Sequence, residues 1–117
     1  MDKDFDLTAA RAAREVAFKE YAAAADVAFN TLESAEAAYR VATHASDNKD
    51  PNVDAFISNY KAAYNVACAA ARVSDKAWYA AGDAYAVEAE VLHKISEATE
   101  NYRNTYNKTF NAYTKEL

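Results

Sequence analysis

Glycine, proline and cysteine are nearly absent from this chain of 117 residues, which contains one of each. A single glycine excludes glycine-rich phosphate loops and dinucleotide fingerprints, because these need several glycines for close backbone approach to the ligand. One glycine and one proline also leave too few turn residues for a sheet of several strands. A lone cysteine cannot close a disulfide within the chain or build a thiolate metal cluster. We therefore expect a single all-α domain spanning residues 1–117.

Long apolar runs are also missing. No stretch approaches the roughly 18 consecutive apolar residues of a transmembrane helix. The acidic start, residues 1–6 (MDKDFD), lacks the apolar core of a secretion signal. The free Cys68 is compatible with a reducing compartment. We therefore expect no membrane partner and a cytoplasmic location, in a bacterial cell or a host cell.

Large aliphatic side chains are scarce as well. Leu, Ile, Val and Phe together make up 19 of the 117 residues, whereas alanine alone accounts for 30. Alanine is the best helix former, but it buries little apolar area, and burial is worth only about 25 cal/mol per Å². We expect stable helices around a lean core, which self-association into a homodimer would supplement.

Helical periodicity dominates what is present. The spacing predicts a helix over residues 7–45, with Asp6 or Thr8 as its N-cap. Its candidate seam repeats at alternating intervals of three and four residues, as in a coiled coil. The seam residues are Phe18, Tyr21, Ala25, Ala28, Leu32, Ala35, Tyr39 and Ala42.

A loop over residues 46–50 separates this helix from a second pattern. Asp50-Pro51 suits a helix start, because aspartate caps helices and proline fits the first helical position. The second seam then keeps the same period. It consists of Phe56, Tyr60, Ala63, Ala67, Ala70, Ser74, Ala77 and Ala81.

Gly82-Asp83 is the one candidate interruption after residue 51. In the arrangement we favour, Gly82 ends a helix over residues 51–81 and Asp83 caps a third over residues 84–115. The result is an alanine-rich antiparallel bundle of three helices, up-down-up. In the alternative, the helix runs through Gly82 at a cost of about 1 kcal/mol relative to alanine. The chain is then a dimeric two-helix coiled-coil hairpin, and the last third of its very long second helix needs a partner.

The sharpest metal-like pattern is Glu90-x-x-His93, the spacing found in di-iron sites of four-helix bundles. Glu33 or Glu36 could add a carboxylate. However, the apolar stripe of this segment runs through Val91, which places Glu90 and His93 on the polar face. We predict no metal and no cofactor, and keep Glu90 and His93 only as weak candidates.

Neither His44 nor Cys68 has the neighbours that catalysis requires. Ser46 and Asp47 follow His44, but neighbours on a loop do not form a catalytic triad. Cys68 lies among alanines with one nearby cation, Arg72, which stabilises a thiolate little. We therefore expect no enzymatic activity.

The segment 101–115 differs in kind, because it contains Arg103, Lys108 and Lys115 and no acidic residue. An aromatic stripe follows it at helical spacing. The stripe could be the core seam of the third helix, a protein-binding face, or a platform that stacks on single-stranded nucleic acid. As candidate partner-binding residues we name Tyr102, Arg103, Tyr106, Phe110 and Tyr113.

The net charge of −5 argues against nucleic acid as the partner, since phosphate binding needs a basic surface. We expect a non-catalytic helical interaction module that covers the surface of another protein. It would serve as a small adaptor, an assembly subunit or an inhibitor. The alternatives are mimicry of nucleic acid by the acidic surface, or occlusion of a DNA-processing enzyme, and a carboxylate/histidine metal-binding bundle.

Overall fold

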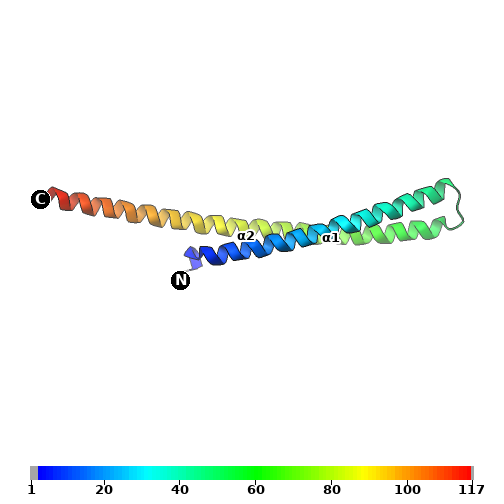
Figure 1. The fold of residues 1–117 in the computed structure, drawn as a ribbon, viewed down its shortest axis with the longest axis horizontal. Helices are drawn as coiled ribbons and strands as arrows, with labels where there is room; N and C mark the ends of the chain where they lie inside the picture. Colours follow the sequence, from blue (N-terminus) through cyan, green and yellow to red (C-terminus); the bar gives the residue numbers. More distant parts are fainter. Residues whose placement is uncertain (1–2, 117) are drawn as a thin grey trace. The chain divides into compact units, whose positions relative to one another are not determined.

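The structure is a computed structural model that describes residues 3–116. It contains a short 3-10 helix, η1 (Lys3–Phe5), and two α-helices, α1 (Leu7–Asp47) and α2 (Val53–Glu116) (Figure 1). Residues 3–116 include no strand. The prediction of an all-α protein is confirmed.

The predicted three-helix bundle is wrong, because α2 continues through Gly82 and no third α-helix is present in residues 3–116. Gly82 does not have the positive φ of a glycine that ends a helix. A Cβ built on it would meet no atom within 4 Å, so this glycine does not serve a close helix approach either. The alternative of two helices is correct, and its dimeric state stays a prediction.

The chain divides into two compact units, and the expectation of a single domain stays a prediction. The hairpin unit consists of Val16–Ala81. The terminal unit consists of Met1–Glu15 and Gly82–Leu117. Both α-helices contribute to both units, since α1 and α2 each cross a boundary between them.

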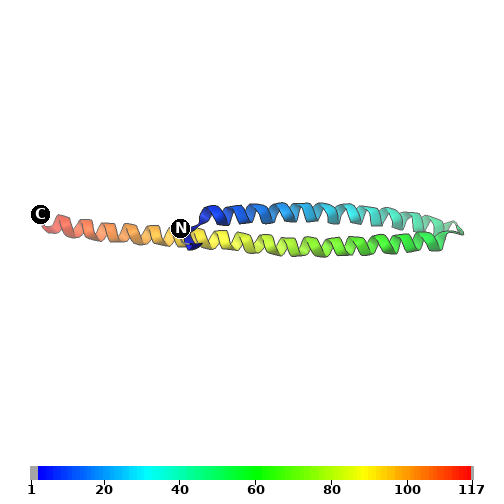
Figure 2. The same cartoon turned by 90° about the horizontal axis from the view of Figure 1, so that it is seen from below.

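Within the hairpin unit, α1 and α2 run side by side in opposite directions (Figure 2). The residues that each helix covers repeat at intervals of three and four. On α2 they include every residue of the predicted seam from Phe56 to Ala81, with Ile57 and Cys68 beside it. On α1 they are Ala17, Tyr21, Ala24, Ala28, Thr31, Ala35, Ala38, Ala42 and Ala45, with Ala25 beside them.

The predicted seam of α1 is therefore correct in part. Five of its eight members are covered, but Phe18, Leu32 and Tyr39 are exposed beside the seam. The smaller residue that precedes each of them on the chain occupies the seam instead. Two helices that meet through alanine approach closely, and this leaves no room for large side chains between them.

The core is correspondingly small. No large side chain is fully buried among the described residues. The buried apolar residues are Ala10, Ala35, Ala42, Ala45, Ala67, Ala81 and Val91. Since alanine carries a single side-chain carbon, this seam fixes the helix geometry but contributes little hydrophobic stabilisation per residue.

A compact turn joins the helices of the hairpin unit. The Asp50 amide donates to the Ala45 carbonyl at 2.9 Å, and the Lys49 amide donates to the Ser46 carbonyl at 3.2 Å. This pair of bonds is a Schellman motif, which satisfies the last carbonyls of α1. Lys49 occupies its left-handed position with a φ of 53°. The Asp50 carboxylate then accepts the amide of Asn52 at 2.8 Å, in line with the predicted capping role of Asp50.

The helix ends lie close to their predicted places. The Asp6 carboxylate accepts the Ala9 amide at 2.9 Å and so caps α1, as one of the two candidates predicted. α1 ends at Asp47 instead of residue 45, and α2 begins at Val53 instead of residue 51. Both differences lie within the uncertainty of any helix end.

The terminal unit contains an ion pair at the helix contact. Arg14 of α1 pairs with Glu88 of α2, and the Arg11 Nε lies 3.7 Å from the same carboxylate. The Glu88 side chain is 12% exposed, so its charge is largely removed from water. A charged pair at this depth favours one register of the helices, because sliding either helix would leave a charge unpaired.

The N-terminal segment contacts α2 through Asp4. The Lys94 ammonium of α2 lies 3.2 Å from the Asp4 carboxylate and 3.7 Å from the Glu90 carboxylate. The hydrogen bond to Asp4 raises the pKa of Lys94 above its ordinary 10.5, and desolvation opposes this in part. A raised pKa means that the contact stabilises the folded chain at neutral pH. This contribution is lost only as the pH rises through the raised pKa of Lys94 in the folded chain.

Replacing Lys49 by glycine should stabilise the hairpin unit by about 1 kcal/mol, because glycine adopts the left-handed conformation without a Cβ clash. Urea unfolding followed by circular dichroism measures the change. Lys49→Ala is the matched control, since it removes the same side chain and keeps the Cβ. Equal stability of the two variants would show that the backbone conformation at this residue costs nothing.

Replacing Arg14 alone by methionine should destabilise the protein by about 1–2 kcal/mol, because Glu88 would keep a poorly solvated charge without its main partner. The double variant Arg14→Met/Glu88→Met should recover most of that loss. A urea series on the wild type, both single variants and the double variant gives the coupling energy. Additive losses in the double variant would rule out a paired role.

Candidate protein-interaction surface

The C-terminal part of α2 has no covering element within its own unit. Asp4, in the N-terminal segment of the terminal unit, contacts Lys94 of α2. Beyond Ile95, every residue from 96 to 115 is exposed. Figure 2 shows this end of α2, coloured orange to red, with no second ribbon beside it. We call residues 96–115 the exposed tail.

The aromatic stripe predicted from the sequence lies on this exposed tail. Tyr102 is 73% exposed, Tyr106 58%, Phe110 53% and Tyr113 61%. The rings of Tyr106 and Phe110 stack, with centroids 6.3 Å apart and planes at 9°. The interpretation of the stripe as the seam of a third helix is wrong, because no third helix is present in residues 3–116 to form it.

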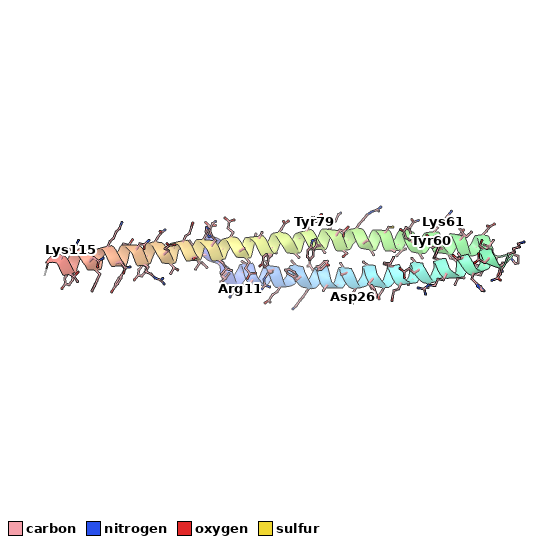
Figure 3. All side chains as sticks on the ribbon, turned by 90° about the horizontal axis from the view of Figure 1, so that it is seen from above. Arg11, Asp26, Tyr60, Lys61, Tyr79 and Lys115 are labelled. Atoms are coloured by element: carbon pink, nitrogen blue, oxygen red, sulfur yellow. The ribbon has the colours of Figure 1, made fainter. Side chains whose placement is uncertain are left out.

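Positive charge accompanies the stripe. Arg103, Lys108 and Lys115 are exposed on the same stretch, and residues 101–115 contain no acid (Figure 3 labels Lys115). The chain as a whole carries −5. Residues 101–115 therefore carry apolar rings and cations, whereas the rest of the chain is acidic.

The composition of the exposed tail supports a helix poorly. Asparagine, threonine and tyrosine each cost up to about 0.7 kcal/mol relative to alanine in a helix interior. Three of its threonine hydroxyls donate back to carbonyls of the same helix, from Thr99 to Ile95, Thr109 to Thr105 and Thr114 to Asn111. Most helical stability in proteins comes from packing of an apolar face. A partner that packs against the stripe would supply what the tail lacks.

The weak metal candidates do not converge. The Glu90 carboxylate lies 3.7 Å from the Lys94 ammonium, and the His93 Nε2 lies 3.1 Å from Glu97. Glu36 pairs instead with Arg40 at 3.8 Å, as its spacing predicts. Across residues 3–116, no group of three or more His, Cys, Asp or Glu side chains is placed to hold a metal ion.

The other chemically notable side chains have ordinary surroundings. The His44 ring nitrogen lies 3.2 Å from the Asn48 side-chain amide, at the end of α1. Cys68 is a free, half-buried thiol on α2.

Sequence reasoning missed two apolar faces of the hairpin unit, one on each side of the alanine seam. The aromatic face consists of Phe18, Phe29, Leu32, Tyr39, Tyr64 and Trp78, all exposed. Rings gather along it: Tyr21 and Trp78 lie 5.1 Å apart, and Tyr39 and Tyr60 lie 5.0 Å apart. A hollow of about 220 Å³ opens between Leu32, Tyr39 and Tyr64 on this face.

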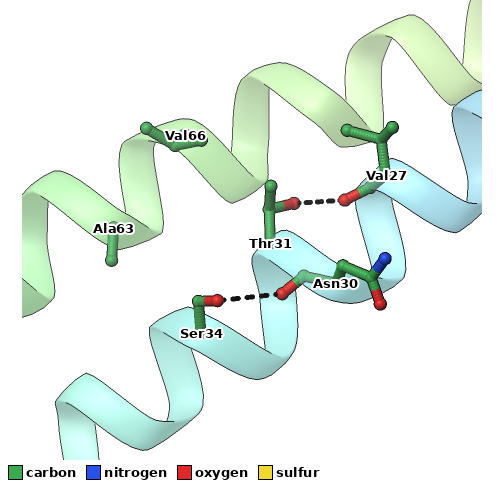
Figure 4. Close-up of a pocket in the computed structure, with 6 residues that line it drawn as sticks. All are labelled: Val27, Asn30, Thr31, Ser34, Ala63 and Val66. Atoms are coloured by element: carbon green, nitrogen blue, oxygen red, sulfur yellow. Dashed lines mark hydrogen bonds between the residues drawn. The ribbon is translucent and has the colours of Figure 1, made fainter.

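The opposite side, which we call the valine face, consists of Val27, Val41, Val66 and Val73, also exposed. Figure 4 shows its middle, where Val27 and Thr31 of α1 meet Ala63 and Val66 of α2 around a shallow hollow. The hydroxyl of Thr31 donates to the Val27 carbonyl at 2.9 Å. The side-chain hydroxyl of Thr31 is therefore already hydrogen-bonded within α1. The signal for both faces was present in the sequence, since apolar residues flank the seam at heptad intervals.

Comparisons with family models, curated sequences and solved structures found no match to this chain. No helix in the described part of the chain has both the length and the hydropathy to span a membrane.

The exposed tail should exchange its amide hydrogens much faster than α2 within the hairpin unit, because nothing packs against it. Hydrogen–deuterium exchange with peptide-level mass spectrometry compares residues 96–115 with residues 56–81 in one sample. Equal protection in both stretches of the isolated chain would mean that something already covers the tail.

Proposed function

We propose that the protein is a non-catalytic helical interaction module that uses the exposed tail to bind another protein. The observation that carries this proposal is the aromatic stripe on residues 96–115, which is exposed throughout in the described part of the chain. The module would act as an adaptor, an assembly subunit or an inhibitor by occupying its partner's surface. We place its action in the cytoplasm, where Cys68 would stay reduced.

The mode of binding that suits this geometry is a helix lying in a groove. Tyr102, Tyr106 and Phe110 follow each other at intervals of one helical turn, and Tyr113 continues the row. Aromatic anchors of this kind give a large contact area with few rotatable bonds. The partner's groove would be apolar at its floor and acidic at its rim, to meet Arg103, Lys108 and Lys115.

The exposed tail would gain order on binding. Its helix is supported by neither packing nor composition, so a partner must supply the free energy that orders it. Affinity should then depend on a few aromatic anchors, while the three cations should mainly raise the association rate at low salt.

A photo-crosslinking residue at position 106 of the full-length chain identifies the partner in cells that produce the protein. The same residue at position 79 is the control, because Tyr79 is 72% exposed on the outer side of α2 and is not part of residues 96–115 (Figure 3). Capture from position 106 alone supports the proposal.

With that partner in hand, Tyr106→Ala and Phe110→Ala should each weaken binding by about 1–2 kcal/mol, as expected for hot-spot residues. Tyr79→Ala should leave the affinity unchanged. Titration calorimetry measures the three affinities, and circular dichroism checks that helicity is kept. Full affinity in the Tyr106→Ala/Phe110→Ala double variant would overturn the assignment of the tail as the binding surface.

A further inference from the structure

The flanking positions of the hairpin unit are unusual for a pair of helices exposed to water. A two-stranded coiled coil normally places Glu and Lys beside its seam. Here Glu20 is the only charged residue at these positions within residues 16–81. Those on the aromatic side are Phe18, Ala25, Leu32, Tyr39, Ser46, Ile57, Tyr64, Ala71 and Trp78, and those on the valine side are Glu20, Val27, Ser34, Val41, Asn59, Val66, Val73 and Ala80.

The aromatic face is large enough to form an interface. Its six defining side chains are between 39% and 60% exposed. An aromatic side chain offers about 150–250 Å², so these six leave roughly 600 Å² of mostly apolar surface in water. Stable interfaces bury about 600–1,000 Å² per partner, so this face reaches the lower end of that range. An exposed apolar patch of this size often marks an interaction site.

We propose that a second copy of this chain covers the aromatic face. The two copies pack face to face and antiparallel, with α2 of one lying along α2 of the other. A two-fold axis passes beside Cys68. This places Phe18, Leu32, Tyr39, Tyr64 and Trp78 inside a four-helix assembly formed by two alanine-seamed hairpins.

Charge placement on α2 selects both the direction and the register. Lys61, Cys68 and Asp75 follow each other at intervals of seven residues, beside the aromatic face. A two-fold axis at Cys68 sets Lys61 opposite Asp75 of the partner subunit, and symmetry forms the same pair twice. Parallel packing in register would instead set Lys61 against Lys61 of the partner subunit and Asp75 against Asp75 of the partner subunit.

The same axis sets large side chains against small ones. Tyr64 comes to lie over Ala71 of the partner subunit. Ala71 and Cys68 line a hollow of about 300 Å³ together with Phe29 and Leu32. On α1, the ring contacts between the helices fix which residues lie level with one another, and the axis then brings Tyr39 over Ala22 and Ala25 of the partner subunit. Projections therefore meet gaps along both helices, as close packing requires.

The lean core gives the second copy a physical purpose. The hairpin unit buries only alanines in its own seam, and no large side chain is fully buried. Pairing through the aromatic face moves the large apolar side chains out of water. The valine face offers smaller side chains and carries Glu20 and Asn59, so it is the weaker candidate for pairing.

Sedimentation velocity on the full-length chain tests the proposal across micromolar concentrations. The wild type should sediment at twice the 12.8 kDa mass of one chain. Lys61→Glu and Asp75→Lys should each raise the dissociation constant of the dimer about tenfold or more, because each places like charges opposite each other. The double variant K61E/D75K should restore wild-type dimerisation, since it exchanges the two partners.

Lys76→Glu and Asp26→Lys are the matched controls, because they make the same charge changes at exposed positions away from the aromatic face (Figure 3 labels Asp26). Both should leave the dissociation constant unchanged. A short bismaleimide should couple Cys68 to Cys68 of the partner subunit and give a covalent dimer of the wild type and of K61E/D75K. Circular dichroism of every variant checks that its helicity is kept.

A monomer throughout the range, a dimer insensitive to charge reversal at residues 61 and 75, or a dimer in which Cys68 does not couple would each overturn the proposal. The dimer is independent of the proposed function. Tyr106→Ala should leave the dissociation constant unchanged, and Lys61→Glu should leave partner binding by the exposed tail intact. Failure of one proposal therefore leaves the other to be judged separately.

Discussion

Close approach of two helices through alanine is the constraint on which the rest of the hairpin unit depends. Alanine makes up most of the seam on both helices, and most large side chains lie beside it. Side chains of one carbon allow two helix backbones to approach closely. Phe18, Leu32 and Tyr39 are exposed for this reason, each beside a smaller residue that occupies the seam. The same constraint produces the lean core and the two apolar faces. Large apolar side chains that the hairpin unit does not bury between its own helices stay on its surface.

The sequence predicted those features that depend on local chemistry. Asp6 and Asp50 accept the amides expected of capping residues, and the seam from Phe56 to Ala81 is covered as its spacing indicated. The favoured break at Gly82 was wrong: α2 continues through this residue, since a glycine in a helix costs only about 1 kcal/mol relative to alanine. On α1, two adjacent stripes satisfy the same three-and-four spacing, one rich in alanine and one with large side chains. Only the partner helix, whose seam is also alanine, decides between them.

The sequence identified the candidate binding residues by their type, and the structure shows that they are exposed on α2. Tyr102, Tyr106, Phe110 and Tyr113 share a helix face whether or not they are covered, so spacing alone could not separate a core from a binding surface. The structure describes no third helix in residues 3–116 and shows the stripe exposed, which rules out the core of a third helix. The two apolar faces were not found from the sequence, since they become visible only against the correct seam of α1. The exposure of a residue one position away from the seam depends on how the other helix packs against it.

The position of Trp78 has an optical consequence. It is the only tryptophan of the chain, it contacts Tyr21, and it lies half exposed on the aromatic face. The emission of an indole ring shifts to shorter wavelength when water leaves the ring. Trp78 therefore reports on the hydration of the aromatic face. Tyr21, at a ring separation of 5.1 Å, can pass its excitation to that indole. Ultraviolet fluorescence can thus follow wetting and drying of this face without any added label.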